Sequence, residues 1–153
     1  MPVEEGHPAP TFTLPSDTGE PVSLAELRGK PVVLYFYPKD DTPGCTTQAC
    51  GIRDVYGELE RAGAVVLGVS PDDEASHVKF KNKFSIPFPL LADPEHEVTE
   101  QYGVWEEKKF GGKTYWGVKR STFLIDSEGN VAKVMHNVKP DGHPEQVLAA
   151  LPS

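Results

Sequence analysis

The sequence predicts an α/β fold with a mixed central sheet and helices on both faces of that sheet. Apolar runs of strand length, rich in β-branched and aromatic residues, alternate along the chain with segments whose apolar residues recur at helical spacing. The last two strand candidates are joined by a Ser-Glu-Gly-Asn turn, which indicates an antiparallel hairpin at the end of the sheet. At 153 residues the chain suits one domain, residues 1–153, with a single core.

The first part of the chain predicts short elements only. Residues 2–10 are punctuated by proline and glycine, which indicates an irregular arm. Short strands are expected at 11–14 and 21–24, on either side of a turn-rich Ser-Asp-Thr-Gly cluster. Ser23 stands three residues before Glu26, a spacing typical of a capping box, so a short helix is expected to begin here.

The rest of the chain carries longer and more regular patterns. Asp72 is the expected N-cap of one helix, whose inward face should carry Val78, Phe80 and Phe84. The charged, glycine-broken segment 106–113 predicts an exposed loop or hairpin. The other elements are expected, in chain order, at 31–37 (strand), 46–62 (helix), 64–70 (strand), 72–84 (helix), 88–92 (strand), 93–102 (helix), 121–126 and 130–136 (strands) and 144–151 (helix).

Composition and charge narrow the classes of function. The formal net charge is −8, which argues against nucleic acid or an anionic membrane as a partner, because both bind basic surfaces. No apolar run is long enough to span a membrane, and no signal-like segment is visible at the N-terminus. We therefore expect a cytoplasmic protein. In that compartment two cysteines indicate redox chemistry more often than a structural disulfide.

Cys45 is expected where a strand leads into a helix. The apolar run 31–37 comes before it, a Pro/Asp/Thr/Pro/Gly turn cluster lies between, and helical spacing follows from Thr46. Unpaired N–H groups and the helix dipole favour an anion at this place, and a thiolate is the form that attacks peroxides and disulfides. The alternative is that Cys45 is a small buried apolar residue.

Cys50 lies on the same predicted helix as Cys45. Five helical residues rise about 7.5 Å and leave the two Cα atoms roughly 8–9 Å apart, beyond the ~7 Å limit for a disulfide. A disulfide between these cysteines therefore requires the first helical turns to unwind. Gly51 marks the expected place, because glycine costs about 1 kcal/mol relative to alanine in a helix. The pattern predicts a two-cysteine redox site with a local unfolding step.

The stretch from Pro38 to Thr46, Pro-Lys-Asp-Asp-Thr-Pro-Gly-Cys-Thr, resembles the active-site signature of the peroxiredoxins, specifically of their PrxQ or bacterioferritin comigratory protein branch. Pro38, Thr42 and Cys45 fill the family pattern. Cys50 matches the resolving cysteine of that branch, five residues downstream. The resemblance extends from about residue 6 to residue 151.

Two further positions bear on this resemblance. The segment from Arg120 to Asp126 is similar to the one that supplies the active-site arginine of the family. Gln48 departs from the pattern, since the branch usually carries glutamate there, so any role of that carboxylate does not carry over to this chain.

The resemblance implies a thioredoxin-like fold and a thiol-dependent peroxidase that reduces hydrogen peroxide and organic hydroperoxides. Cys45 is then the peroxidatic cysteine, which becomes a sulfenic acid, and Cys50 is the resolving cysteine, which closes an intramolecular disulfide. Thr42, Arg120 and the backbone near Gly44 are implied to bind the peroxide. Thioredoxin or a similar dithiol is the implied reductant, no cofactor is implied, and we expect a monomer.

Other interpretations of the same residues stay open. Thr42 fits equally an N-cap hydroxyl, Pro38 either shields the sulfur or is an ordinary turn proline, and Arg120 fits an exposed arginine at a strand end. The same cysteine pair would also serve a redox-sensing switch that binds a partner when the helix melts. A redox-inert α/β binding module with two buried thiols is a further alternative.

The remaining polar and aromatic residues give weaker indications. The five histidines are scattered and the cysteines lack zinc-site spacing, so no metal site is expected, and the spacing is not C-x-x-C either. Asp40 and Asp41 are expected to face water. Phe110 and Trp116, close along the chain to Arg120, are candidates for the rim of a substrate pocket.

Overall fold

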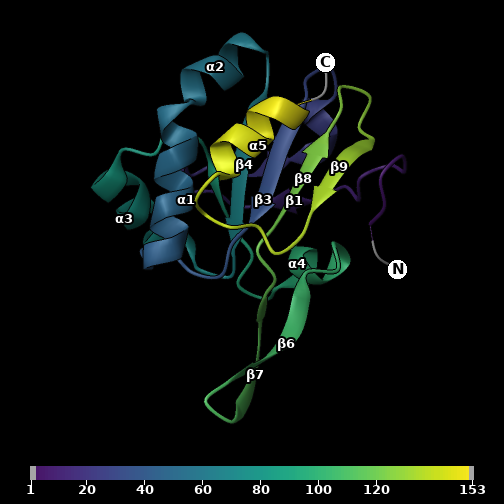
Figure 1. Ribbon diagram of the computed structural model, residues 1–153. Helices are drawn as coiled ribbons and strands as arrows, with labels where there is room; N and C mark the ends of the chain where they lie inside the picture. Colours follow the sequence, from purple (N-terminus) through teal and green to yellow (C-terminus); the bar gives the residue numbers. More distant parts are fainter. Residues whose placement is uncertain (1–2, 152–153) are drawn as a thin grey trace.

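The computed structural model describes residues 3–151, so residue 2 of the predicted N-terminal arm lies outside the described range (Figure 1). Its centre is a five-stranded sheet. The strands, in sheet order, are β5 (Leu90–Ala92), β4 (Val65–Ser70), β3 (Val32–Phe36), β8 (Ser121–Ile125) and β9 (Val131–Met135). The β5–β4 and β4–β3 pairs are parallel, whereas the β3–β8 and β8–β9 pairs are antiparallel, which confirms the predicted mixed sheet.

Helices cover both faces of the sheet, as predicted. One face packs under α1, α2, α3 and α5, and the other under α4, the 3₁₀ helix η1 and the N-terminal segment. Strand β3 is buried on both sides, with Val33 and Tyr35 on the first face and Leu34 and Phe36 on the second. The helices are η1 (Leu24–Leu27), α1 (Pro43–Asp54), α2 (Tyr56–Arg61), α3 (Glu74–Phe84), α4 (Glu97–Gln101) and α5 (His143–Ala150).

The helix expected at 46–62 is two helices in the structure. It begins three residues earlier, at Pro43, because proline has the backbone φ of a first helical residue and needs no N–H partner there. The first helix, α1, ends at Asp54, and the N–H of the next residue, Val55, bonds to the carbonyl of Ile52 in a tight turn. A short second helix, α2, follows at once.

One predicted helix cap and one predicted inward side chain are wrong. Ser23 is the N-cap residue of η1, as predicted, although its side chain makes no capping hydrogen bond. Helix α3 is capped by Asp73 rather than Asp72, with Asp73 Oδ1 accepting from the N–H of Ser76 at 2.8 Å. Val78 points outward and is 40% exposed, because the inward positions of this helix are taken by other side chains, among them Phe80.

Two small sheets complete the fold. Strands β1 (Thr13–Leu14) and β2 (Val22–Ser23) pair antiparallel, close to the predicted ranges. The segment expected as a loop or hairpin is the hairpin of β6 (Trp105–Phe110) and β7 (Lys113–Val118), which projects from the body of the molecule (Figure 1). Its turn residues Gly111 and Gly112 both have positive φ, as a two-residue hairpin turn requires.

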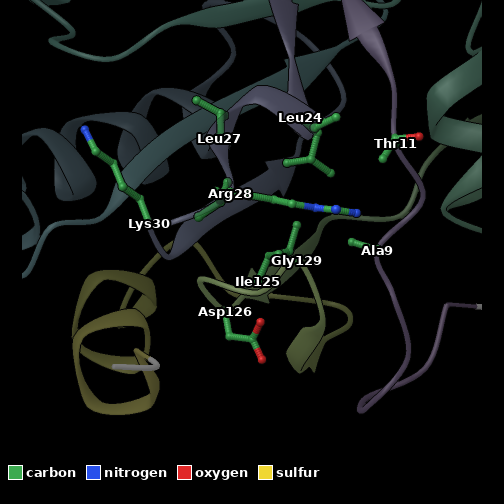
Figure 2. A pocket seen from close by; sticks show the side chains of 11 residues that line it. Ala9, Thr11, Leu24, Leu27, Arg28, Lys30, Ile125, Asp126 and Gly129 are labelled. Carbon is green, nitrogen blue, oxygen red and sulfur yellow. The ribbon is translucent and has the colours of Figure 1, made fainter.

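The amino end of β3 is closed by side chains from η1 and from the β8–β9 turn. Arg28 crosses this end of the sheet below Leu24 and lies against Gly129 (Figure 2). Gly129 has a φ of +89°, and a Cβ there would lie 3.2 Å from Nε of Arg28, so both the turn and the packing favour glycine. The carboxyl end of β3, at the opposite side, leads into the loop that carries the candidate active site.

Candidate active site

Cys45 lies in the first turn of α1, after the loop that follows β3, so the predicted strand-to-helix position is confirmed. Its side chain is buried, with 2% exposure, and packs with the core on the α1 face of the sheet. Because the first intrahelical backbone bond of α1 runs from the N–H of Thr46 to the carbonyl of Thr42, the amides of Gly44 and Cys45 have no helical acceptor. The site therefore presents free N–H groups and the positive end of a helix dipole to the sulfur.

Arg120 lies directly beside this sulfur. It stands just before β8, and its Nη2 donates to Cys45 Sγ at 3.4 Å, while its Nη1 donates to Gln48 Oε1 at 2.6 Å. Gly44 makes this approach possible, since a Cβ at that position would lie 3.1 Å from Nη2 of Arg120. The structure thus brings together Cys45, Arg120 and Gly44.

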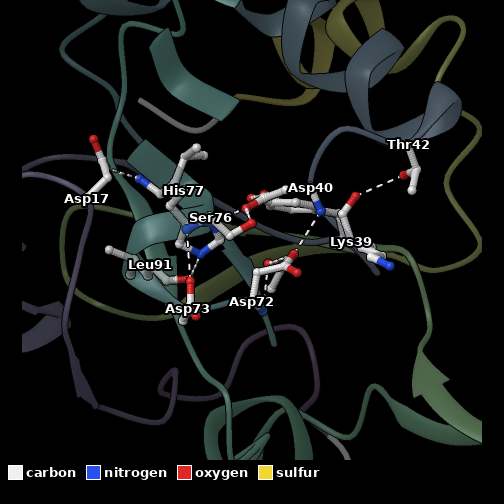
Figure 3. Close-up of polar contacts among 12 residues, drawn as sticks. Asp17, Lys39, Asp40, Thr42, Asp72, Asp73, Ser76, His77 and Leu91 are labelled. Atoms are coloured by element: carbon white, nitrogen blue, oxygen red, sulfur yellow. Dashed lines mark hydrogen bonds and ion pairs between the residues drawn. The ribbon is translucent and has the colours of Figure 1, made fainter. Parts of the chain in front are cut away.

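Thr42 and Pro38 lie on the same loop. The hydroxyl of Thr42 donates to the carbonyl of Lys39 at 2.8 Å, and its backbone is the N-cap of α1 without a side-chain capping bond (Figure 3). Thr42 therefore occupies the N-cap position of α1, but its hydroxyl is not the capping group, because no N–H of the first helical turn donates to it. Pro38 is half-buried between β3 and α1.

Cys50 also belongs to α1 and is partly buried, and both cysteines are free thiols. A single helix from Pro43 to Asp54 holds the two residues too far apart for a disulfide, so the predicted need for unwinding stands. Gly51 has a packing role that the sequence did not reveal. A Cβ on Gly51 would lie 2.7 Å from Cγ of Pro144, because α5 packs against α1 at this point.

The Gly51→Ala substitution is therefore expected to destabilise the protein. The helix would gain about 1 kcal/mol from propensity, but overpacking against Pro144 typically costs about 1–3 kcal/mol. Urea denaturation of the reduced protein measures the difference. The matched control is Gly51→Ala in a Pro144→Ala background, which removes the collision. Relative to the Pro144→Ala protein, this double variant should show the gain in helix propensity and slower disulfide formation. A single variant as stable as the double variant would contradict this packing role.

Asp40 is buried, which corrects the expectation that it faces water. Its carboxylate accepts three hydrogen bonds: from the hydroxyl of Tyr37 at 2.6 Å, the hydroxyl of Ser76 at 2.8 Å and Nδ1 of His77 at 2.6 Å (Figure 3). Asp41 does face solvent, where it pairs with Lys83 at 2.8 Å. The donors that surround Asp40 come from the residue after β3 and from α3, a proximity that sequence spacing does not show.

His77 is fully buried with an acceptor at each ring nitrogen. Nδ1 lies against Asp40, and Nε2 donates to the carbonyl of Leu91 at 2.8 Å. Burial lowers the pKa of His77, but the hydrogen bond and charge of Asp40, with the Leu91 carbonyl, outweigh it and the net pKa is raised. The resulting ion pair ties the loop before Cys45 to α3.

Gln48 and His143 form a second buried group that sequence reasoning missed. Gln48 Nε2 lies 3.4 Å from His143 Nδ1, and His143 Nε2 lies 2.8 Å from Thr122 Oγ1. All three side chains are fully buried. Burial, and to a smaller degree Arg120, lowers the pKa of His143 to about 4. A histidine immediately before a helical proline near the C-terminus carried no sequence signal that linked it to Cys45.

Lys108 of the β6–β7 hairpin is half-buried. Burial lowers the pKa of Lys108, the carboxylate of Glu106 opposes that shift, and the guanidinium of Arg120 adds to it. Phe110 is 81% exposed at the end of β6, and Trp116 lines an open hollow with Trp105. That Phe110 or Trp116 shapes the rim of a substrate pocket stays a prediction.

A thioredoxin-like α/β fold with a buried cysteine at a helix N-terminus, held by an arginine, defines a thiol-based oxidoreductase. Residues 5–134 match the AhpC/TSA family. The chain is 54% identical over 151 residues to a putative peroxiredoxin bcp of Coxiella burnetii, covering 99% of this chain and 100% of that one. Peroxiredoxin Bcp of Escherichia coli is 48% identical, over 96% of this chain and 94% of the relative.

Solved structures agree with these relatives. A bacterioferritin comigratory protein of Xanthomonas campestris with alkyl peroxide reduction activity superposes with a TM-score of 0.87 at 40% identity, covering 91% of this chain and 88% of the other. A cysteine-to-serine variant of Xylella fastidiosa PrxQ superposes with a TM-score of 0.92 at 31% identity, covering 97% and 95%. The chain belongs to the AhpC/TSA family, in its PrxQ or bacterioferritin comigratory protein branch, and is a thiol-dependent peroxidase of the peroxiredoxin class.

Proposed function

We propose that this protein reduces hydrogen peroxide and organic hydroperoxides with Cys45 as the attacking thiolate and Cys50 as the resolving thiol. The observation that carries this assignment is the hydrogen bond from Arg120 Nη2 to Cys45 Sγ at 3.4 Å, at the free N–H end of α1. Such a position stabilises both an anionic sulfur and an anionic oxygen.

The first step is a displacement on oxygen. The thiolate of Cys45 attacks one peroxide oxygen, the S–O bond forms as the O–O bond breaks, and the leaving hydroxide or alkoxide takes a proton to give water or an alcohol. Arg120 and the amides near Gly44 donate to the peroxide oxygens as charge develops on them. Thr42 contributes an acceptor, because its own proton is donated to the carbonyl of Lys39 and its lone pairs stay available for a peroxide O–H. Pro38 shields the sulfur from water.

The second step forms the disulfide. The thiol of Cys50 attacks the sulfenic sulfur of Cys45, the S–O bond breaks, and water leaves. Because both residues lie on α1, its first turns must unwind for the two sulfurs to meet. Thioredoxin or a similar dithiol then supplies two electrons by thiol–disulfide exchange through a mixed disulfide.

Intact mass spectrometry of the reduced protein, quenched at early times after one equivalent of hydrogen peroxide, tests this cycle. We expect a transient one-oxygen adduct followed by the loss of two hydrogen atoms. No change in mass over minutes would overturn the proposal. Repeated turnover with excess peroxide and a dithiol separates the enzyme from a redox-sensing switch, which would react once.

The Cys50→Ser variant is expected to stop at the sulfenic acid. The first step needs only the Cys45 environment, so its rate should be preserved, whereas no intramolecular disulfide can follow. The mass spectrum should show a persistent one-oxygen adduct, and further peroxide should drive it to the sulfinic acid. Prompt loss of two hydrogens in this variant would remove Cys50 from the resolving role.

We also infer a single domain over residues 1–153, a monomeric state and a cytoplasmic location. Light scattering after size-exclusion chromatography measures the oligomeric state. Between residues 3 and 151, the structure contains no helix that is both long and apolar enough to cross a membrane.

A further inference from the structure

The side chain of Gln48 is held in one orientation by its neighbours. Its Oε1 accepts from Nη1 of Arg120 at 2.6 Å, a short bond from a charged donor. If the amide were turned over, its NH₂ group would face the guanidinium, with donors against donors in a fully buried place. The amide nitrogen therefore points to His143, where it needs an acceptor.

His143 supplies that acceptor in only one protonation form. An imidazole with a pKa of about 4 is neutral at ordinary pH and carries one N–H. Since Nδ1 faces the amide N–H of Gln48, it must hold a lone pair, and the ring proton lies on Nε2, which then donates to Thr122 Oγ1 at 2.8 Å. The Nε2–H tautomer alone satisfies both ring nitrogens.

The ring is also held firmly in place. His143 packs edge-on against Tyr35 of β3, with 5.9 Å between ring centroids. It is the first residue of α5, and the next residue, Pro144, packs on Gly51 of α1, which sets how closely the two helices approach. The imidazole of His143 therefore has little freedom to move if the oxygen and nitrogen of the Gln48 amide exchange places.

We propose that His143 is a positioning residue which, through the amide of Gln48, holds Arg120 against Cys45. The inference rests on the proposed role of Arg120 and Cys45 in peroxide reduction. The chain of contacts runs from Thr122 through His143 and Gln48 to the guanidinium, whose second nitrogen donates to the sulfur. Every member between Thr122 and Arg120 is uncharged, so the amide orients the guanidinium without neutralising it.

Nuclear magnetic resonance of the histidine rings tests the arrangement without peroxide. In long-range ¹H–¹⁵N spectra of the reduced, unsubstituted protein at neutral pH, His143 should show a protonated Nε2 and an unprotonated Nδ1. The signal is assigned by its absence in the His143→Asn variant. A protonated Nδ1 would overturn the proposal, because it would place a donor against the Gln48 amide.

The matched variants are His143→Leu and His143→Asn, whose side chains have the same number of non-hydrogen atoms and branch at the same carbon. Asparagine can place its Oδ1 where the Nδ1 lone pair was, whereas leucine removes the acceptor. Single-turnover reaction of Cys45 with hydrogen peroxide should slow by on the order of tenfold or more in the leucine variant, as expected when a catalytic group loses its alignment, and stay close to the unsubstituted rate in the asparagine variant. Equal rates in two folded variants would overturn the positioning role.

The two tests separate this inference from the proposed function. If the unsubstituted protein fails to react with peroxide, the proposed function fails, while the tautomer still reports on the contacts of His143. If the protein reacts rapidly but shows the wrong tautomer, the positioning role alone fails. Should the leucine variant not fold, as circular dichroism would show, the tautomer measurement still decides.

Discussion

Replacement of Cys45 by serine is expected to lower the second-order rate constant for hydrogen peroxide by a factor on the order of 10³ or more. A hydroxyl in the same place stays protonated and is a far weaker nucleophile than a thiolate, although it would keep the contact with Arg120. The measurement is stopped-flow consumption of peroxide by the reduced protein. Because the substitution changes one atom, the buried site should stay folded.

The control for this experiment is the Cys50→Ser variant, which has lost one thiol as well but should keep the fast first reaction. The contrast between the two serine variants therefore assigns the nucleophile. Fast peroxide consumption by the Cys45→Ser protein would mean that Cys50, or a residue outside α1, attacks the peroxide.

Replacement of His77 by leucine is expected to destabilise the protein by about 3–5 kcal/mol, the range found when one partner of a buried ion pair is removed. The carboxylate of Asp40 would lose its charged partner in a place with little access to water. Urea denaturation measures the change in the free energy of unfolding. The double variant His77→Leu/Asp40→Asn removes the stranded charge as well, so it should lose less stability than the sum of the single variants. Additive losses would show that the two residues do not interact.

The same pair predicts how stability depends on pH. The folded-state pKa of His77 is raised, so its stabilising contribution is complete below the unfolded value of about 6.5 and is lost as the pH rises through the folded-state pKa. Denaturation between pH 6 and pH 9 should show this loss in the unsubstituted protein and a smaller one in the leucine variant. Identical pH profiles would contradict the charged state of His77.

Local sequence determined the central strands and the place of Cys45. The runs 31–37 and 64–70 became β3 and β4 with boundaries shifted by at most one residue, because β-branched, continuously apolar segments are suited to a strand buried on both faces. The turn cluster before Thr46 predicted that the strand ends and a helix begins there, because proline and glycine determine the dihedral angles of their own backbone. The resemblance on Pro38, Thr42 and Cys45 predicted the family, which the relatives confirm.

Tertiary structure alone decided what surrounds the sulfur. Arg120 reaches Cys45 because β3 and β8 pair with Phe36 opposite Ser121, which brings the residue before β8 to the loop after β3. That register depends on pairing across many residues, and no local pattern reports it.

The same reason explains the wrong expectation for Asp40 and the unexpected role of His143. An aspartate in a turn cluster is normally solvated, yet α3 supplies Ser76 and His77 to Asp40 across more than thirty residues. His143 meets Gln48 across 95 residues. A buried polar group needs hydrogen-bond partners, and these come from whichever elements the fold packs around it. The sequence by itself therefore determined which thiol is reactive, and the packing of distant elements decided which groups hold that thiol in place.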